Sequence, residues 1–485
     1  MPIKMSQDEI RAVYRQGEDA VVGLITMLID RLNSLEEEVT RLKGIINKDS
    51  HNSSKPPSTD FKRPAPKSLR KKGKRKSGGQ PGHQGFYLQQ VAEPDHRIFH
   101  SITGKCPCGE AIRNGKRLDD ERRQTVDIPP PQKLQYTEHC AERFKCRCGR
   151  IHTAPFPIGV DAPIQYGARI RALQTYLSIY QLLPQKRCVE MLNDVFGVQL
   201  SEGTLNNTLQ LAYRNLGKTE TAIKEAIRSS PVMNLDETGM YVNGKRLWEH
   251  SSSTDLYTYY FCHQKRGGDA IEAGGMLWEY LGRIVHDGWK SYFDFDCLHA
   301  LCNAHHLREL VFIKEQYKQK WAGSMIELLC RIKKTVDKAK EKKRSQLTSG
   351  TLLRYRNRYR RLIAAGYRAN PAKPPSERRS GQRGKLKQHP ARNLLDRLKK
   401  YEREALAFMY DFNVPFDNNL AERDLRMTKV KQKISGCFRS FTGVQTFCRI
   451  RGYISTVRKH GHNTLEYLYK CFQTDGNDIL VPQNT

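Results

Sequence analysis

Three acidic residues, far apart in the chain, have the types and positions that metal-dependent chemistry needs. Asp236 lies in Asn-Leu-Asp-Glu-Thr-Gly, Asp287 in His-Asp-Gly-Trp-Lys, and Glu422 in Asn-Asn-Leu-Ala-Glu-Arg-Asp-Leu-Arg. The hydrophobic pattern predicts strands that end at the first two and a basic helix that carries the third. Carboxylates that converge on a sheet can hold two divalent cations, which suits the cutting and joining of phosphodiesters. We therefore expect a protein that acts on nucleic acid.

The elements that must position the two aspartates follow residue 231. A buried strand leads to Asp236, and Asn243-Gly244 predicts a hairpin between residues 240–242 and 246–249. A third strand (256–262), a helical stretch (269–281) and a fourth strand (282–287) come next. The order β-β-β-α-β is that of an RNase H-like sheet, in which strands one and four are neighbours.

This order would place Asp236 beside Asp287. Glu237 is a rival carboxylate, but alternation along a strand places its side chain on the opposite face from Asp236. The alternative for either aspartate alone is that it caps a turn.

The third carboxylate begins a helix for which Asp417 is the expected cap. Glu422, Arg426 and Lys429 share one face of that helix. A solvated Glu–Arg pair is the alternative to a role in which Glu422 binds metal and the cations hold phosphates. The other candidate DNA-contacting residues in this half of the chain are Lys290, Arg423, Lys431 and Lys433.

Between the second and third carboxylates lie a Cys-x-x-His pair and a long basic segment. Cys302 and His305 are spaced to share a helical face, and a structural pair beside the active site is favoured over a zinc site. The basic segment predicts a helical insertion at about residues 308–410.

Two Cys-x-Cys-Gly repeats mark a small module at residues 93–158. Four thiolates in two close pairs can hold a tetrahedral structural Zn²⁺, and each glycine allows a tight turn around its pair. The candidate ligands are Cys106, Cys108, Cys146 and Cys148, with His100, His139, Cys140 and His152 as substitutes. Free cysteines in a small β domain are the alternative.

The N-terminal region predicts a helix followed by a basic linker. Apolar residues at heptad spacing over residues 21–46 favour a coiled-coil dimer within a helix at 6–48; packing against the same chain is the alternative. Residues 49–92 read as a disordered linker that either contacts DNA phosphates or only solubilises the chain. Its candidate DNA-contacting residues are Lys71, Lys72, Lys74, Arg75 and Lys76.

Residues 159–228 read as helical, and within them residues 187–209 have the form of a helix-turn-helix. Gly197 would make the turn and Ser201 would cap the second helix. Helical hairpins are common in proteins of many functions, so this pattern alone does not specify DNA binding, and DNA contact by this region is a hypothesis.

Composition supports a polyanionic partner. The 485 residues include 83 Lys and Arg against 51 Asp and Glu, a formal charge of +32. Such an excess favours nucleic acid, and the absence of a long apolar run argues against a membrane. Thirteen cysteines and no signal-peptide pattern favour a reducing compartment, so we expect a cytoplasmic, nucleoid-associated protein of a prokaryote.

The motifs together resemble the transposases of insertion-sequence family sixty-six. The resemblance rests on Asp-Glu-Thr, Asp-Gly, the Cys-Pro…Cys-Gly module and the segments 51–58, 78–85, 302–305 and 418–426. It implies a DDE transposase with an RNase H-like domain, two Mg²⁺ ions (or Mn²⁺), and Asp236, Asp287 and Glu422 as the triad. Cys302 and His305 would be the family's Cys-x-x-His signature. At Cys106-Pro-Cys108 the chain departs from the relatives' frequent Cys-x-x-Cys.

We therefore expect a multidomain α+β and α/β protein. Its RNase H-like catalytic domain would span residues 229–475, and its partners would be element-end and target DNA, a second copy of the chain, and accessory proteins of the same element. A non-catalytic DNA-binding regulator and a nuclease without strand transfer are the alternatives.

Overall fold

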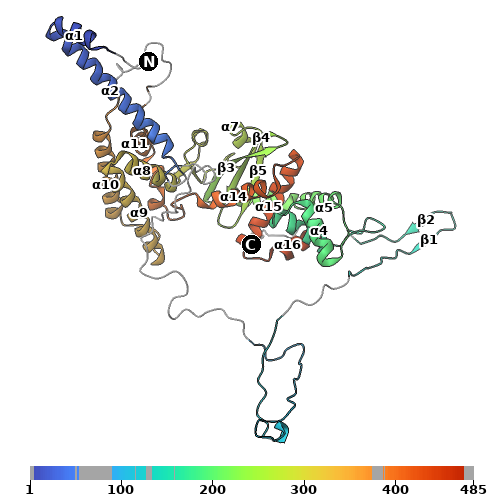
Figure 1. Ribbon diagram of the computed structural model, residues 1–485. Coiled ribbons are helices and arrows are strands. Elements are labelled where there is room, and N and C mark those ends of the chain that lie inside the picture. Colours follow the sequence, from blue (N-terminus) through green and yellow to red (C-terminus); the bar gives the residue numbers. More distant parts are fainter. Residues whose placement is uncertain are drawn as a thin grey trace.

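A five-stranded mixed sheet with helices around it forms the centre of the molecule (Figure 1). The computed structural model describes residues 5–49, 52–53, 90–114, 116–126, 134–157, 159–373, 386 and 388–473. Lys71, Lys72, Lys74, Arg75 and Lys76, with most of the expected linker, lie outside the described residues.

The strands of the sheet are arranged in the order β5-β4-β3-β6-β7. The first three, β3 (Val232–Val242), β4 (Lys245–Ser253) and β5 (Thr258–His263), form an antiparallel meander. Asn243 and Gly244 have φ of 45° and 77°, as the predicted hairpin turn requires. Strands β6 (Arg283–His286) and β7 (Leu298–Leu301) extend the sheet in parallel from β3.

Three expectations for this sheet need correction. Strand β3 does not end at Asp236 but continues six residues further. Its pairing with β6 ends at Asn234, but its pairing with β4 continues to Val242. The helical stretch before β6 is shorter than expected, since α7 covers only Gly268–Ala273. Strand β7 was not foreseen, and Cys302 follows it as the N-cap of the next helix rather than lying within one.

Helices cover both faces of the sheet. One hydrophobic core joins the far ends of β3 and β4 to α14 (Asn419–Ser435), α15 (Phe441–Lys459) and α16 (Thr464–Cys471). The same core includes the helical region that precedes the sheet: α3 (Ala168–Thr175), the π-helix η3 (Tyr176–Tyr180), α4 (Gln185–Phe196) and α5 (Glu202–Asn215). On the opposite face, α6 (Gly217–Arg228) and α7 pack on Met233, Leu235 and Ile284.

A second helical block lies between β7 and α14 and has its own core. Val285 and Ala300 of the sheet border this core. Its helices are α8 (Asn303–Tyr317), α9 (Lys320–Glu341), α10 (Ser349–Ala369), α11 (Pro390–Lys400), α12 (Glu402–Ala405) and α13 (Ala407–Tyr410). The chain therefore leaves the sheet after β7, contacts β7 again through α12 and α13, and then continues into α14, which packs on β3 and β4.

The helix-turn-helix pattern has the local geometry that the sequence predicts. Gly197 ends α4 in a left-handed conformation, with φ of 68°, and the Ser201 hydroxyl accepts a hydrogen bond from the Thr204 amide at the start of α5. The buried side of α5 contributes Leu205 and Leu209 to the core that it shares with α15.

The N-terminal helix is divided in two. A Ser6–Glu9 capping box starts α1 (Gln7–Arg15), and Gly17, with φ of 103°, separates it from α2 (Glu18–Ile46). Within the part of the chain that the structure describes, the end of α2 contacts α8, where Asn47 Nδ2 donates to Gln316 Oε1 at 2.9 Å. The side chains of the heptad seam at Ile25, Leu28, Leu32, Leu35, Val39 and Leu42 are exposed.

Two short segments carry the Cys-x-Cys-Gly repeats. The second repeat lies in a hairpin of β1 (Arg143–Lys145) and β2 (Ile151–Thr153), and a bridge between Lys105 and Ala111, just before the short 3-10 helix η2 (Ile112–Asn114), frames the first. None of the helices that the structure describes is long and apolar enough to cross a bilayer.

Candidate active site

The register of the sheet places two of the three carboxylates side by side. Strand β3 pairs with β6 from Val232↔Arg283 to Asn234↔Val285, and the same offset relates Asp236 to Asp287 two residues further on. Asp287 follows β6 directly, and its Oδ1 accepts a hydrogen bond from the Trp289 amide at 2.8 Å. The two aspartates therefore lie where β6 ends and β3 continues.

Glu237 points away from this pair. Its carboxylate accepts hydrogen bonds from Arg266 Nη2 and from the Tyr292 hydroxyl, both at 2.5 Å. Leu235, two positions earlier on the same face of β3, is buried in the core that contains Tyr292. This is the orientation that alternation along the strand predicts, so the Glu237 carboxylate is held by structural partners.

Glu422 returns to the sheet from the first turn of α14. Its Oε1 lies 3.9 Å from His305 Nδ1, and its Oε2 lies 3.8 Å from Arg308 Nη2. Glu422 also contributes to the electrostatics of Asp236. Residues 236 and 422, which are 186 positions apart in the chain (422 − 236), are thus close enough for their charges to interact.

Asn418 holds the start of α14 against the sheet. Its Nδ2 donates to the Leu235 carbonyl at 2.7 Å, and its Oδ1 accepts from Asn234 Nδ2 at 2.8 Å. Its backbone amide donates to Cys302 Sγ at 3.1 Å. Asn418, rather than the expected Asp417, is the N-cap of the helix, and its side chain is used for strand β3 instead of the helix backbone.

Asp424 anchors the next turn of α14 from below Glu422. Its carboxylate accepts hydrogen bonds from the Ser253, Thr258 and Ser455 hydroxyls and forms a 2.9 Å ion pair with Lys459. Both charged side chains are only 12% exposed. The roles of Asn418, Asp424 and Arg308 are not evident from the sequence pattern. The one available signal is that each lies within four residues of Asp417, Glu422 or His305.

Asp236 is buried and has acidic residues around it. Burial is the main cause that raises the pKa of Asp236 well above its usual value, and the charges of Glu237, Asp287 and Glu422 add to it. Such a cluster of oxygen donors favours either a bound proton or a bound cation. The three carboxylates supply oxygen donors of the type that Mg²⁺ prefers, but their oxygen atoms do not all lie within 4.8 Å of one another among the described residues.

Cys302 and His305 lie next to Glu422 rather than forming a separate pair. One ligand atom from each of the three residues lies within 4.8 Å of the other two, which is the only such group of His, Cys, Asp or Glu in the described parts of the chain. Burial, followed by the charge of Arg308, lowers the pKa of His305, which favours the neutral ring. Its Nδ1 and Glu422 Oε1 are buried without a hydrogen-bond partner.

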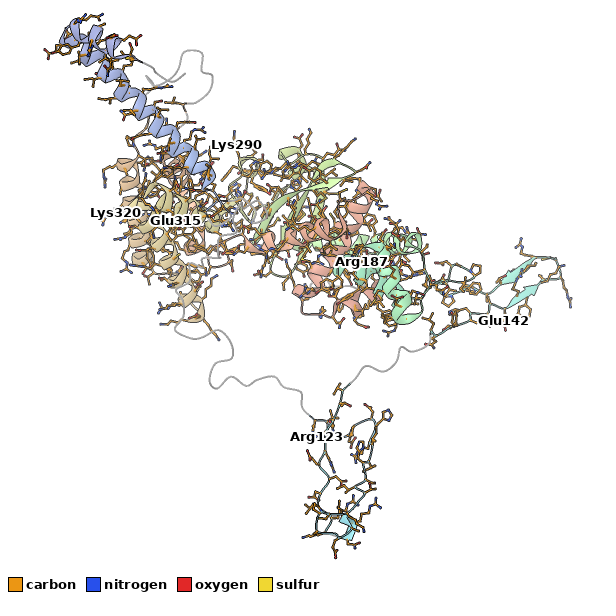
Figure 2. The ribbon with its side chains drawn as sticks, in the orientation of Figure 1. Arg123, Glu142, Arg187, Lys290, Glu315 and Lys320 are labelled. Atoms are coloured by element: carbon orange, nitrogen blue, oxygen red, sulfur yellow. The ribbon has the colours of Figure 1, made fainter. Side chains whose placement is uncertain are left out.

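The expected DNA-contacting cations differ in exposure. Lys290 (labelled in Figure 2), Arg423, Arg426 and Lys433 are exposed. The Lys429 ammonium donates to the Gly239 carbonyl, so it is tied to strand β3. Lys431 is half-buried over the Phe438 ring, and burial lowers its pKa, which makes it the weakest of these candidates.

The Cys-x-Cys-Gly repeats form two matching turns. In each turn the first cysteine amide donates to the carbonyl four residues on, and the glycine amide donates to the carbonyl of the first cysteine, all at 2.8 Å. Gly109 and Gly149 have φ of 94° and 86°. The four sulfurs are exposed and are not brought together, because the segments that carry Arg123 and Glu142 extend in different directions (Figure 2).

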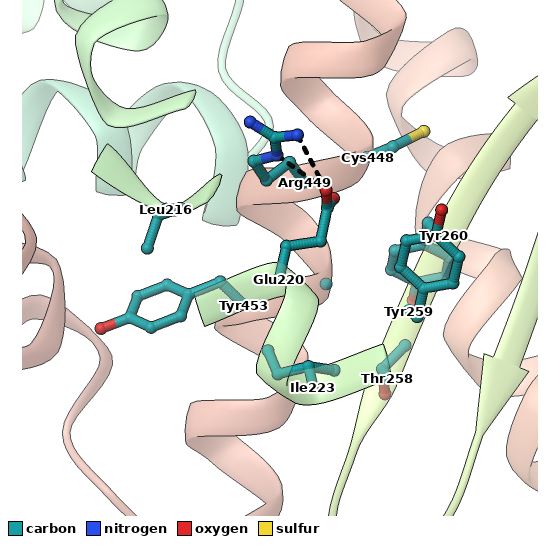
Figure 3. A pocket seen from close by; sticks show the side chains of 10 residues that line it. Leu216, Glu220, Ile223, Thr258, Tyr259, Tyr260, Cys448, Arg449 and Tyr453 are labelled. Atoms are coloured by element: carbon teal, nitrogen blue, oxygen red, sulfur yellow. Dashed lines mark hydrogen bonds and ion pairs between the residues drawn. The ribbon is translucent and has the colours of Figure 1, made fainter. Parts of the chain in front are cut away.

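A crevice between α6, β5 and α15 is a separate feature (Figure 3). Its volume of about 10 Å³ has room for roughly one water molecule. The ion pair between Glu220 and Arg449, at 2.8 Å, lies in this crevice, and none of the three candidate catalytic carboxylates lines it. We assign it a packing role.

The chain is similar to a known family of proteins over most of its central and C-terminal parts. Residues 163–446, more than half of the chain, match the family described as "Transposase IS66 family", so this is a transposase-type protein. The chain belongs to the IS66 transposase family. Residues 4–89 match a family of unknown function, DUF6444, and no curated protein matches the chain.

Proposed function

We propose that the chain is a DDE-type DNA transposase that cuts DNA at the ends of its element and joins the freed 3′ ends to target DNA. The observation that carries this proposal is the return of Glu422 to the edge where Asp236 and Asp287 lie. The sheet order, with three antiparallel strands followed by two parallel ones, supports the proposal of an RNase H-like catalytic domain.

In this proposal Asp236, Asp287 and Glu422 hold two Mg²⁺ ions, for which Mn²⁺ could substitute. Two bound ions supply an activated oxygen nucleophile and stabilise the leaving 3′ oxygen. The protein's own part is to hold the carboxylates in place: Asn418 and Asp424 fix the helix that carries Glu422, and the end of β6 fixes Asp287. No side chain is required as a covalent nucleophile.

DNA would bind along the cations near this edge. Lys290, Arg423, Arg426 and Lys433 are exposed and can neutralise phosphates, which gives affinity without sequence readout. The linker cations Lys71, Lys72, Lys74, Arg75 and Lys76 would add to this term. Reading of the element ends would fall to the helix-turn-helix at α4 and α5 and to a Zn²⁺ module that would form if the two cysteine turns came together, with Cys106 and Cys108 from one turn and Cys146 and Cys148 from the other.

The catalytic proposal is tested with Asp236→Asn, which removes the charge and keeps the shape. We expect Mg²⁺-dependent cleavage and joining of labelled DNA from the flanks of the gene to fall by roughly 10³-fold or more, with DNA binding retained. Asp269→Asn is the matched control, because Asp269 is exposed and forms a surface ion pair with the exposed Lys265. Full strand transfer by Asp236→Asn would refute the assignment.

The same assay separates the alternatives. A DNA-binding regulator would bind the end DNA and leave it uncut at every Mg²⁺ concentration. A nuclease of the RNase H type would release cut ends without joined products. Strand-transfer products that depend on Asp236 are expected only from a transposase.

We also propose that α2 forms a homodimeric coiled coil. Its heptad side chains are exposed in the single chain, for example Leu32 at 61% and Leu35 at 50%. Leu28→Lys with Leu35→Lys should convert a dimer to a monomer in light scattering. Asp30→Lys with Glu36→Lys adds charge to the same helix outside the seam and should leave the mass unchanged; equal effects of both pairs would contradict the proposal.

A further inference from the structure

A sulfur, an imidazole and a carboxylate meet at the junction of β7, α8 and α14. Cys302 follows β7 as the N-cap of α8, His305 lies in the first turn of that helix, and Glu422 comes from α14. Cys302 Sγ, a His305 ring nitrogen and a Glu422 oxygen all lie within 4.8 Å of one another. Three elements of the fold thus contribute one donor atom each to a single point.

Two of these donors have no partner of their own. His305 Nδ1 and Glu422 Oε1 are buried without a hydrogen bond, although they face each other. Their separation of 3.9 Å is too long for a hydrogen bond. It is close to the spacing of about 3.5 Å that two ligands have when both bind one tetrahedral ion at roughly 2.1 Å. A shared cation would satisfy both atoms at once.

Backbone amides lie around the buried Cys302 sulfur. The Asn418 amide donates to Cys302 Sγ at 3.1 Å, and the amides of Ala304 and His305, at the start of α8, also interact with it. Backbone donors aimed at sulfur, together with the positive end of a helix, stabilise negative charge on a cysteine ligand. A purely apolar site for a packed cysteine would have no such donors.

We propose that Cys302, His305 and Glu422 form a binding site for a borderline-soft divalent cation of the Zn²⁺ class. Mixed sulfur, nitrogen and oxygen donors select Zn²⁺ or Co²⁺ over Mg²⁺, which prefers oxygen ligands. Three protein ligands leave a fourth position open to water. The ion would bind Glu422 Oε1 and join α14 to the β7–α8 junction. Glu422 Oε2, which lies 3.8 Å from Arg308 Nη2, would remain as the oxygen for the proposed Mg²⁺ site.

This site is independent of the Cys-x-Cys-Gly module, and its existence does not rest on the proposed transposition chemistry. It involves only one of the three proposed catalytic carboxylates. Asp236 and Asp287, which offer oxygen donors alone, would keep their preference for Mg²⁺.

Cobalt binding provides the test, with the full chain carrying Ser at Cys106, Cys108, Cys146 and Cys148 so that those sulfurs cannot contribute. In excess Mg²⁺, which competes for the carboxylate site, we expect this protein to bind one Co²⁺ per chain with a sulfur-to-cobalt charge-transfer band. Cys302→Ala should lose the band and the ion, whereas Cys302→Asp should lose the band and keep the ion. Asp287→Asn should retain both.

His305→Gln gives a second route to the result that leaves the buried sulfur in place, and circular dichroism checks that each variant is folded. It should lose the bound ion. A parent protein that binds no Co²⁺, or a band that persists in Cys302→Ala, would overturn the site. Because the readout is spectroscopic, loss of strand transfer with cobalt binding intact would refute the proposed function alone.

Discussion

Two regions of this protein carry metal-ligand side chains, and they are built in opposite ways. Each Cys-x-Cys-Gly turn is closed by hydrogen bonds that span at most four residues, such as Cys106 N to Glu110 O. The carboxylate centre depends on contacts across more than 100 residues, such as Asn418 to Leu235 and to Cys302. Local turns can shape one ligand pair, but only a complete fold can assemble the carboxylates.

The pKa shifts in the two regions also have different origins, local in the cysteine turns and long-range in the carboxylate centre. In the exposed turns, hydrogen bonds from nearby amides and from the paired cysteine lower the pKa of Cys108 and of Cys146. In the carboxylate centre, burial and like charges raise the pKa of Asp236. Local hydrogen bonds alone therefore lower the pKa of Cys108 and Cys146, whereas the raised pKa of Asp236 depends on the complete fold, and a bound cation would favour its ionised form.

The largest expected effect comes from breaking the long-range region at Asp424→Ala. This change leaves the Lys459 ammonium buried without its carboxylate, which should cost about 3–5 kcal/mol of the free energy of unfolding. Denaturant titration measures the loss. Metal binding by the Cys-x-Cys-Gly turns should be unaffected, and a parallel loss there would contradict the independence of the two regions.

A smaller change in the free energy of unfolding, in the stabilising direction, is expected from Asp236→Asn in chelator-treated protein. Because folding raises the pKa of Asp236, the folded chain holds the proton more tightly, and its stabilising contribution is lost as the pH rises from the unfolded towards the folded value. Asn cannot ionise, so the variant should gain thermal stability over the parent, and the gain should be larger at pH 8 than at pH 5. A gain in thermal stability that is the same at pH 5 and pH 8 would show that the pKa of Asp236 is not raised by folding.

The smallest effect should come from the local region. Gly149→Ala forces a residue with a side chain into a φ of 86°, which should cost about 1 kcal/mol. Because Gly149 has no other atom near the position of a new Cβ, the cost is conformational rather than steric. Metal affinity of the Cys-x-Cys-Gly turns should fall severalfold, with the main unfolding transition unchanged. Ser77→Ala, which lies outside the turns, is the control.

The sequence alone determined the features that short-range rules govern. Alternation placed Glu237 opposite Asp236, Asn243-Gly244 specified the hairpin between β3 and β4, and each cysteine pair formed its tight turn around a glycine. Gly197 and Ser201 likewise ended and began helices where expected. Each of these outcomes depends on backbone conformations and hydrogen bonds within a few residues, so the residue types suffice to specify them.

Tertiary structure alone decided what those elements do together. The four-residue strand β7 is too short for a pattern to reveal, and it exists because it pairs with β6. Asn418 caps α14 in place of the expected Asp417, and its side chain binds strand β3. Glu422 lies next to Cys302 and His305, although the inserted helices separate them in the sequence. The physical reason is that such contacts form only when the core on each side of the insertion has packed, and no local pattern encodes the distance between segments that far apart.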